Sequence, residues 1–115
     1  MKTLKLTGIL FLLLISAKVV EAQDIFRIIK NGNSEKFSQW LNTNDSAIHY
    51  RDQYENTLLH MAVYHNQLEF QNKLLEYGAD IQAVNQSGRN ALVFAIARND
   101  KNSAQLFIRN GINLR

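Results

Sequence analysis

The 115-residue sequence contains no cysteine and no proline. Without cysteine the chain can form no disulfide, no lipid anchor of the lipoprotein type and no cysteine-ligated zinc site. Small secreted domains of animals commonly depend on disulfides because their cores are small, so this chain has to be stabilised by packing alone. If the chain is exported, the absence of cysteine is more typical of a bacterial protein than of an extracellular animal module.

Sequence motifs of catalytic and metal sites are also missing. The sequence has no G-x-S-x-G nucleophile motif, no glycine-rich phosphate loop and no H-E-x-x-H zinc motif. His49 and His65 are isolated from other potential ligands along the sequence. Asp52 and Glu55 lie near His60, but carboxylates at a turn usually cap backbone groups or face water. We therefore expect no enzymatic activity, no metal and no small-molecule cofactor.

Residues 1–22 have the three parts of an export signal. Residues 1–5 are basic, residues 6–17 are mostly apolar, and Val20-Glu21-Ala22 is a small-x-small cleavage site. The apolar run is shorter than the roughly 20 residues that a membrane-spanning helix needs. We expect cleavage after Ala22, which would place residues 23–115 in the periplasm or outside a bacterium, with no membrane anchor.

The basic charge of the chain comes largely from this signal. Residues 1–22 hold three lysines and one glutamate, so their removal lowers the formal net charge from +3 to about +1. The remaining Lys and Arg residues are spread along the sequence, whereas a nucleic-acid binder concentrates them on one face. We expect no nucleic-acid partner.

The rest of the sequence repeats at an offset of 33 residues. Residues 56–62 align with residues 89–95, and residues 74–81 align with residues 107–114, so that the apolar positions coincide. A weaker copy runs from Asp24 to Arg51. A period of this size indicates stacked units, each of which buries its apolar side against its neighbours.

The middle copy resembles the ankyrin repeat. Residues 57–62 read TLLHMA, which is similar to the family signature T-P-L-H-x-A, and residues 74–80 read LLEYGAD, which matches the ending L-L-x-x-G-A-D. The resemblance implies an all-α solenoid of about three helix-turn-helix units with degenerate first and last units as caps. The expected units are a first unit at residues 24–51, a middle unit at 52–84 and a last unit at 85–115.

The resemblance also implies the roles of the signature residues. His60 is expected to bond to the Thr57 side chain and to neighbouring backbone, holding the turn. Ala62 belongs to the packed signature, and Gly78 and Gly111 are expected to end the second helices at positive φ.

The same alignment predicts helix boundaries. Thr57 suits the N-cap of the first helix in the middle unit, and the second helix is expected from about residue 68 to 77 with Leu68 buried. In the last unit, helices are expected at residues 91–98 and 103–109.

In the first unit, Ser34 is a plausible N-cap and Trp40 is expected to fill the core. Lys101 and Ser103 stand where a central repeat carries apolar residues, which is typical of a terminal cap that tolerates water.

Ankyrin stacks generally bind proteins through their turn tips and the exposed side of each first helix. Tyr and Arg dominate interface hot spots, and a short stack offers roughly 800 Å² to one partner. On this chain the corresponding positions are Gln53, Tyr54, Asn56, Tyr64 and His65 in the middle unit, and Gln86, Ser87, Arg89, Ala97 and Arg98 in the last unit.

The sequence thus predicts an exported, non-catalytic protein-binding module. A sharper hypothesis is an inhibitor or protective partner of a co-exported enzyme. Two alternatives are a secreted effector that binds a host protein, and a structural protein that self-associates through its concave face or an exposed end.

Overall fold

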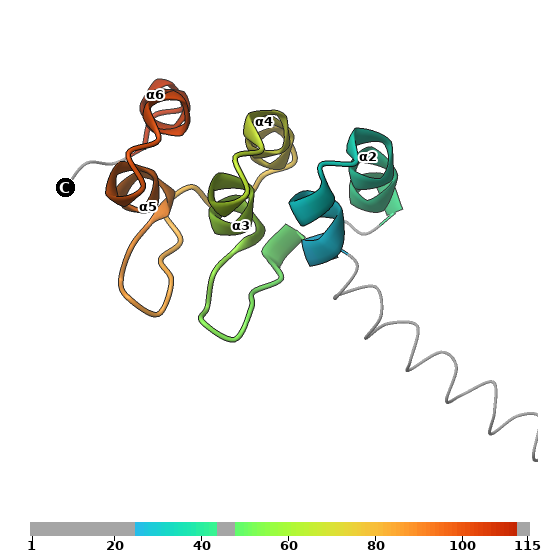
Figure 1. The fold of residues 1–115 in the computed structure, drawn as a ribbon, viewed down its shortest axis with the longest axis horizontal. Helices are drawn as coiled ribbons and strands as arrows, with labels where there is room; N and C mark the ends of the chain where they lie inside the picture. Colours follow the sequence, from blue (N-terminus) through green and yellow to red (C-terminus); the bar gives the residue numbers. More distant parts are fainter. Residues whose placement is uncertain (1–24, 44–47, 113–115) are drawn as a thin grey trace, which may run out of the picture.

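A computed structural model describes residues 25–43 and 48–112 of the chain. The predicted export signal at residues 1–22 lies outside these residues. The described helices are residues 25–31, α2 (Ser34–Thr43), α3 (Leu58–Tyr64), α4 (Leu68–Glu76), α5 (Ala91–Ala97) and α6 (Lys101–Arg109). They form helix pairs that follow one another in a row (Figure 1).

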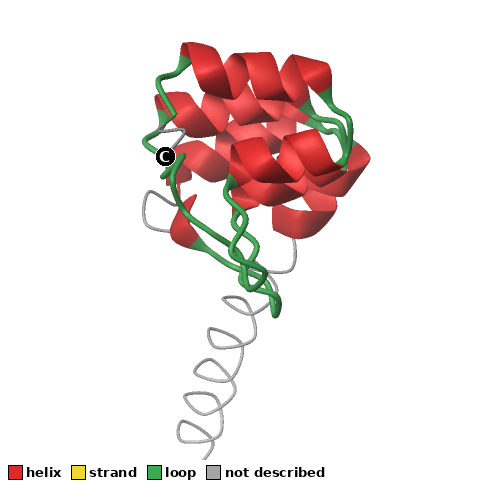
Figure 2. Ribbon diagram, turned by 90° about the vertical axis from the view of Figure 1, so that its left-hand side faces the viewer, coloured by secondary structure: helices red, strands yellow, loops and turns green. Residues whose placement is uncertain are grey.

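The helices lie in two layers. Residues 25–31, α3 and α5 are the first helices of their units and lie on the side from which the connecting loops project, and α2, α4 and α6 lie on the other side (Figures 1 and 2). We call these two sets the inner and the outer helices. Extended pairing in the described residues is limited to an isolated antiparallel bridge between Arg51 and Thr57. The all-α architecture predicted from the sequence is confirmed.

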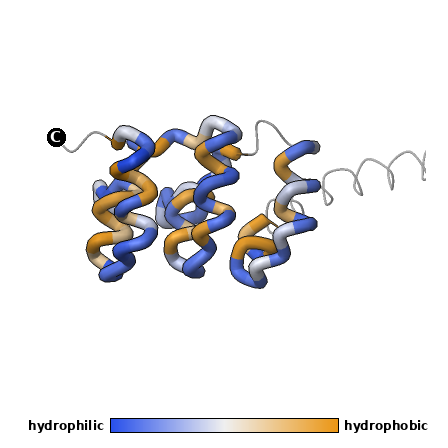
Figure 3. The backbone as a smooth tube through the Cα atoms, turned by 90° about the horizontal axis from the view of Figure 1, so that it is seen from above, coloured by the Kyte–Doolittle hydropathy of each residue, from blue (hydrophilic) through white to orange (hydrophobic). Residues whose placement is uncertain are grey.

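One hydrophobic core runs through the stack. Leu59, Leu74, Leu92 and Phe107 all belong to one buried cluster, as the repeat alignment predicts. The Phe37 and Phe70 rings, which come from adjacent units, stack with their centroids 4.2 Å apart. Hydrophobic and hydrophilic stretches alternate along the helices, as expected for helices with one buried side (Figure 3). Trp40 is also buried, which confirms its predicted place in the core.

The ends of the middle helices follow the predicted chemistry. Thr57 is the N-cap of α3, and its side chain accepts a hydrogen bond from the His60 backbone N–H. Gly78 follows α4 at φ +91°, and a Cβ there would meet no atom within 4 Å. Glycine is therefore favoured at this position by backbone conformation and not by lack of space. Asn66 turns the chain between α3 and α4 at φ +59°, which Asn tolerates better than most residues.

One predicted cap and one predicted helix start were wrong, because a neighbouring polar side chain provides the cap in each case. The Asn33 side chain accepts a hydrogen bond from the Lys36 N–H at 3.0 Å, so Asn33 caps α2 and Ser34 is its first residue. The Asp100 side chain accepts from the Ser103 N–H at 3.1 Å, which starts α6 at Lys101, two residues earlier than expected.

Ser103 is buried at the position where a central repeat carries an apolar residue, and its hydroxyl donates to the Asp100 carboxylate at 2.6 Å. One expectation about burial was wrong. Leu68 was expected in the core, but it opens the first turn of α4 and is 39% exposed. None of the described helices is both long enough and apolar enough to cross a bilayer.

Candidate functional site

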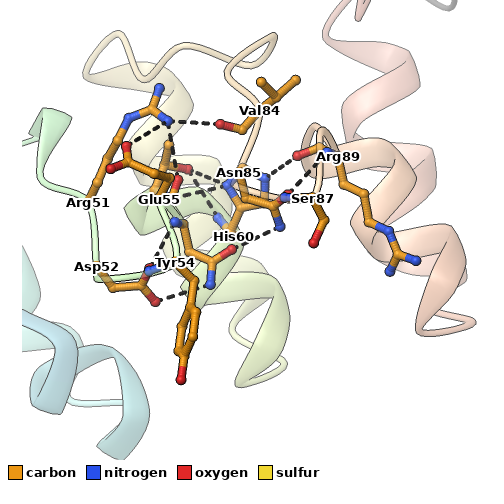
Figure 4. Close-up of polar contacts among 11 residues, drawn as sticks. Arg51, Asp52, Tyr54, Glu55, His60, Val84, Asn85, Ser87 and Arg89 are labelled. Carbon is orange, nitrogen blue, oxygen red and sulfur yellow. Dashed lines mark hydrogen bonds and ion pairs between the residues drawn. The ribbon is translucent and has the colours of Figure 1, made fainter.

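Asp52 and Asn85, which are equivalent in the 33-residue register, fold the two loops in the same way. Asp52 Oδ1 accepts hydrogen bonds from the backbone N–H groups of Tyr54 and Asn56, at 2.8 and 2.9 Å. Asn85 Oδ1 accepts from those of Ser87 and Arg89, at 3.0 and 3.1 Å. Each side chain closes its loop from the inside and fixes the position of the exposed residues at the tip (Figure 4).

The loops of the middle and last units are also bonded to each other. The Asn85 side-chain amide donates to Asn56 Oδ1 at 3.0 Å, and the Gln86 backbone N–H donates to the Tyr54 carbonyl at 2.9 Å. The Arg51 guanidinium donates a hydrogen bond to the Val84 carbonyl at 2.8 Å. These three bonds join the two loops into one platform (Figure 4).

His60, in the first turn of α3, connects the middle unit to the last unit through a hydrogen bond. Its Nε2 lies 2.8 Å from the Arg89 carbonyl oxygen, and its Nδ1 accepts from the Thr57 backbone N–H at 3.2 Å. A carbonyl can only accept, so Nε2 carries the proton and Nδ1 is the acceptor. The predicted bond between His60 and the Thr57 side chain is confirmed, with the Thr57 hydroxyl oxygen 2.8 Å from Nδ1.

The electrostatics of His60 match this structural role. Its side chain is 1% exposed. Burial lowers the pKa of His60, and the hydrogen bond to the Arg89 carbonyl and the nearby Asp52 carboxylate oppose that shift only in part. The imidazole is therefore neutral at pH 7, and both ring nitrogens are engaged within the fold. Neither nitrogen is free to act as an acid or a base on a substrate.

A second group of predicted residues meets at the far ends of the inner helices. The Arg98 guanidinium carbon lies 4.5 Å from the centroid of the Tyr64 ring, and Arg98 Nη2 donates to the Tyr64 carbonyl at 3.1 Å. The His65 ring packs edge-on against Tyr64 at 4.9 Å. We call Tyr64, His65, Ala97 and Arg98 the helix-end cluster.

This cluster has a positive electrostatic environment. The pKa of His65 is lowered, first by partial burial and then by the nearby charges of Lys30 and Arg98. Lys30, His65 and Arg98 come from three successive units, so a line of basic side chains crosses the stack at this level.

The structure divides the ten predicted surface residues into two groups. One is the helix-end cluster, and the other consists of exposed residues on the loop platform, which we call the loop tips: Gln53, Tyr54, Gln86, Ser87 and Arg89. The tenth residue, Asn56, is half-buried and holds the two loops together. The sequence did not identify Arg51 and Asn85 as residues that hold the loops in place. Asn85 could have been identified, because it is equivalent to Asp52 in the 33-residue register.

The described residues 25–43 and 48–112 contain no group of three His, Asp or Glu side chains placed to hold a metal ion. What the arrangement offers instead is a rigid surface of exposed tyrosine, arginine and amide side chains.

Comparison with known families supports the fold assignment independently. The family model described as "Ankyrin repeats (3 copies)" matches residues 25–115. The search of curated proteins found no match.

Proposed function

The chain belongs to the ankyrin-repeat family, whose repeats are protein-interaction modules, and from this premise we propose that it is an exported, non-catalytic protein that binds one partner protein. The proposed contact surface consists of the loop tips and the helix-end cluster. The partner is proposed to be a co-exported enzyme that the chain inhibits or protects.

The contact between Tyr64 and Arg98 carries this proposal. Both residues are exposed, and both are of the types that dominate interface hot spots. Arg98 is already held by a cation–π contact and a hydrogen bond, so binding would cost little additional side-chain entropy. Ordinary surface arginines lack this preorganisation.

The charge of the inner surface indicates the chemistry of the partner. The inner helices, residues 25–31, α3 and α5, contain no acidic residue. Lys30 is exposed on the first of these helices and Arg98 is exposed at the C-cap of α5, and the nearby Asp52 carboxylate is engaged with the backbone of its own loop. A partner segment with acidic side chains and an aromatic or aliphatic anchor would complement this surface.

The proposed export rests on residues 1–22, and the inhibitory role rests on the suitability of a small, rigid, cysteine-free binder for such a task. Two measurements test these parts separately. Processing after Ala22 is checked by N-terminal sequencing of the protein from the exported fraction. Inhibition is checked by assaying a captured enzyme with and without the chain, and unchanged activity would remove the inhibitor hypothesis alone.

Capture with matched variants tests the binding surface. Proteins from the exported fraction are crosslinked to the wild-type chain, to Arg98→Glu and to Lys36→Glu, which makes the same charge change on an exposed position of the outer helix α2. We expect one partner that is retained by wild type and Lys36→Glu, lost by Arg98→Glu, and bound more weakly at higher salt. A partner that is lost equally with both variants, or with neither, would contradict the proposed surface.

A further inference from the structure

The helix-end cluster contains a histidine whose ring nitrogens have no partner within residues 25–43 and 48–112. His65 is the C-cap of α3 and is half-buried. Both ring nitrogens of His60, by contrast, are engaged, with the Thr57 N–H and the Arg89 carbonyl. The Tyr64 ring, which packs edge-on against His65 at 4.9 Å, is itself 50% exposed. The imidazole of His65 is therefore accessible to a ligand from outside, whereas that of His60 is not.

Two permanent positive charges lie near this ring, and they come from the units on either side of it. Lys30 belongs to the inner helix of the first unit, and Arg98 is the C-cap of α5 in the last unit. Both are exposed, and both charges add to partial burial in lowering the pKa of His65. We call Lys30, His65 and Arg98 the basic row.

The acidic side chains of the neighbouring elements are engaged elsewhere. The inner helices contain none. On α4, which packs against α3, Glu69 lies 3.9 Å from Lys73 and Glu76 is at the opposite end of the helix. Both carboxylate oxygens of Asp100 accept hydrogen bonds from Ser103. In the part of the chain that the structure describes, no carboxylate pairs with the basic row.

The side chains of the basic row have donors to spare. Arg98 donates one hydrogen bond, from Nη2 to the Tyr64 carbonyl at 3.1 Å, and a guanidinium carries five N–H groups. The contact with the Tyr64 ring holds the guanidinium in place. Guanidinium, ammonium and imidazolium groups all form charge-assisted hydrogen bonds with carboxylates. An acidic side chain is thus the group that complements this row in both charge and hydrogen bonding.

We propose that an acidic side chain of the partner docks between Lys30, His65 and Arg98, and that His65 takes up one proton from the solvent as it docks. This inference rests on the proposed function, since it names the chemical group that the surface recognises and the condition that favours binding. A carboxylate beside His65 offsets the two positive charges and stabilises the imidazolium. Protonation and docking therefore favour each other, as linkage requires.

The direction of the pH dependence follows from the two states of His65. In the free chain its pKa lies below the ordinary value of 6.5. Docking of a carboxylate raises it, so the complex binds more protons than its separate components and affinity increases as the pH falls. Each unit of that rise multiplies the affinity by about 10, and Asp and Glu stay ionised above about pH 5.5. We expect a gain of about 10-fold between about pH 7.5 and about pH 5.5.

A synthetic peptide serves as the probe, because its chemistry can be controlled. Binding of EEYEE with blocked ends to the full chain is measured by calorimetry at about pH 7.5 and about pH 5.5, a window set by the ordinary pKa of histidine. Circular dichroism at both pH values verifies that the chain stays folded. EEYEE should bind about 10-fold more tightly at the lower pH. The neutral peptide QQYQQ should show no such gain. The imidazole NMR signals of His65 should report a raised pKa in the presence of EEYEE.

Two pairs of variants assign the effect to the basic row. His65→Gln should abolish the pH dependence of peptide binding, and His49→Gln, which removes another exposed histidine, should leave it unchanged. Lys30→Gln should weaken binding of EEYEE about 5-fold by removing one charge–charge contact. Lys36→Gln, which makes the same change on the outer helix α2, should not weaken it.

Three results would overturn the inference: no binding of EEYEE at millimolar concentration, equal affinity at both pH values, or a pH dependence that survives in His65→Gln. A captured partner that is lost by Arg98→Glu but binds equally well at both pH values would also refute it, and would leave the proposed function intact. If no partner is captured although EEYEE binds as expected, the proposed function fails and the acid-binding role of the row stands.

Discussion

His60 Nε2 donates a hydrogen bond to the carbonyl oxygen of Arg89 at 2.8 Å, across 29 residues of sequence. The signature histidine of one repeat thereby supports the loop of the next. This bond, together with the Thr57 cap, makes the geometry of the loop tips depend on the packing between units. It also explains why the imidazole is a structural group in this chain.

Replacing His60 by Ala should destabilise the protein by about 2–4 kcal/mol, because the buried ring leaves a cavity and the Arg89 carbonyl keeps only the Asn85 N–H as a donor. His65→Ala is the matched control, since this ring is only partly buried and should cost about 1 kcal/mol or less. Urea unfolding followed by circular dichroism measures both values. Equal losses in the two variants would contradict the assigned role of His60.

Stability should fall as the pH drops below about 6.5, because burial lowers the pKa of His60 in the folded state below its ordinary value of 6.5. The unfolded chain then binds more protons than the folded chain, so protonation favours unfolding. The contribution is fully present above pH 6.5 and is lost as the pH falls through the lowered pKa. His65 shifts in the same direction and adds to the effect.

Chemical unfolding at a series of pH values from about 7.5 to 5.5 measures this dependence, with the window set by the ordinary pKa of histidine. The decline should be clearly shallower in a His60→Asn variant that still folds. A slope that is identical in this variant and in wild type would refute the assignment to His60.

Glu55→Gly should stabilise the protein by about 1 kcal/mol. Glu55 has φ +61°, and Gly88 occupies the equivalent place in the next loop at φ +75°. A side chain at positive φ costs roughly 1–2 kcal/mol, and only part of that gain is offset by the greater freedom of glycine when unfolded. The ion pair between Glu55 and Arg51 is exposed, so its loss matters little. The converse change, Gly88→Glu, should destabilise by a similar amount in thermal melts, and a stabilising effect would contradict the argument.

Asp52→Asn should change the free energy of unfolding little. Asp52→Ala should lower it by about 1–2 kcal/mol, because the backbone N–H groups of Tyr54 and Asn56 lose their acceptor. Asn85 already performs the same function in the last unit with an amide oxygen, so the negative charge is not needed for the loop to close. Denaturant titration of both variants checks the difference. If Asn were as damaging as Ala, charge and not loop closure would explain Asp52.

The 33-residue register predicted much of the fold because equivalent residues occupy equivalent environments. The buried Leu59 follows from it, whereas the roles of Thr57 and Gly78 were expected from the resemblance to the ankyrin repeat. The register does not predict helix capping, because a cap depends on a single side chain. For this reason Asn33 and Asp100 were missed as caps, and α6 begins two residues earlier than expected.

Surface function was harder to predict for a different physical reason. The register indicates which residues are equivalent, but exposure depends on whether a neighbouring unit is present. Val63 and Ile96 are equivalent, yet Val63 is fully buried and Ile96 is 62% exposed. Asn56 was expected on the contact surface, and its bond to Asn85 was not foreseen, because the loops of adjacent units lie closer than any single repeat can indicate.

The most direct test of the account is hydrogen exchange on the complex with the captured partner, compared with the free chain at the same concentration. We predict that binding slows exchange at residues 52–66 and 85–99, which hold the loop tips and the helix-end cluster, and leaves the outer helices α2 and α4 unchanged. Protection confined to the outer helices, with residues 52–66 and 85–99 exchanging as in the free chain, would contradict the proposed binding surface.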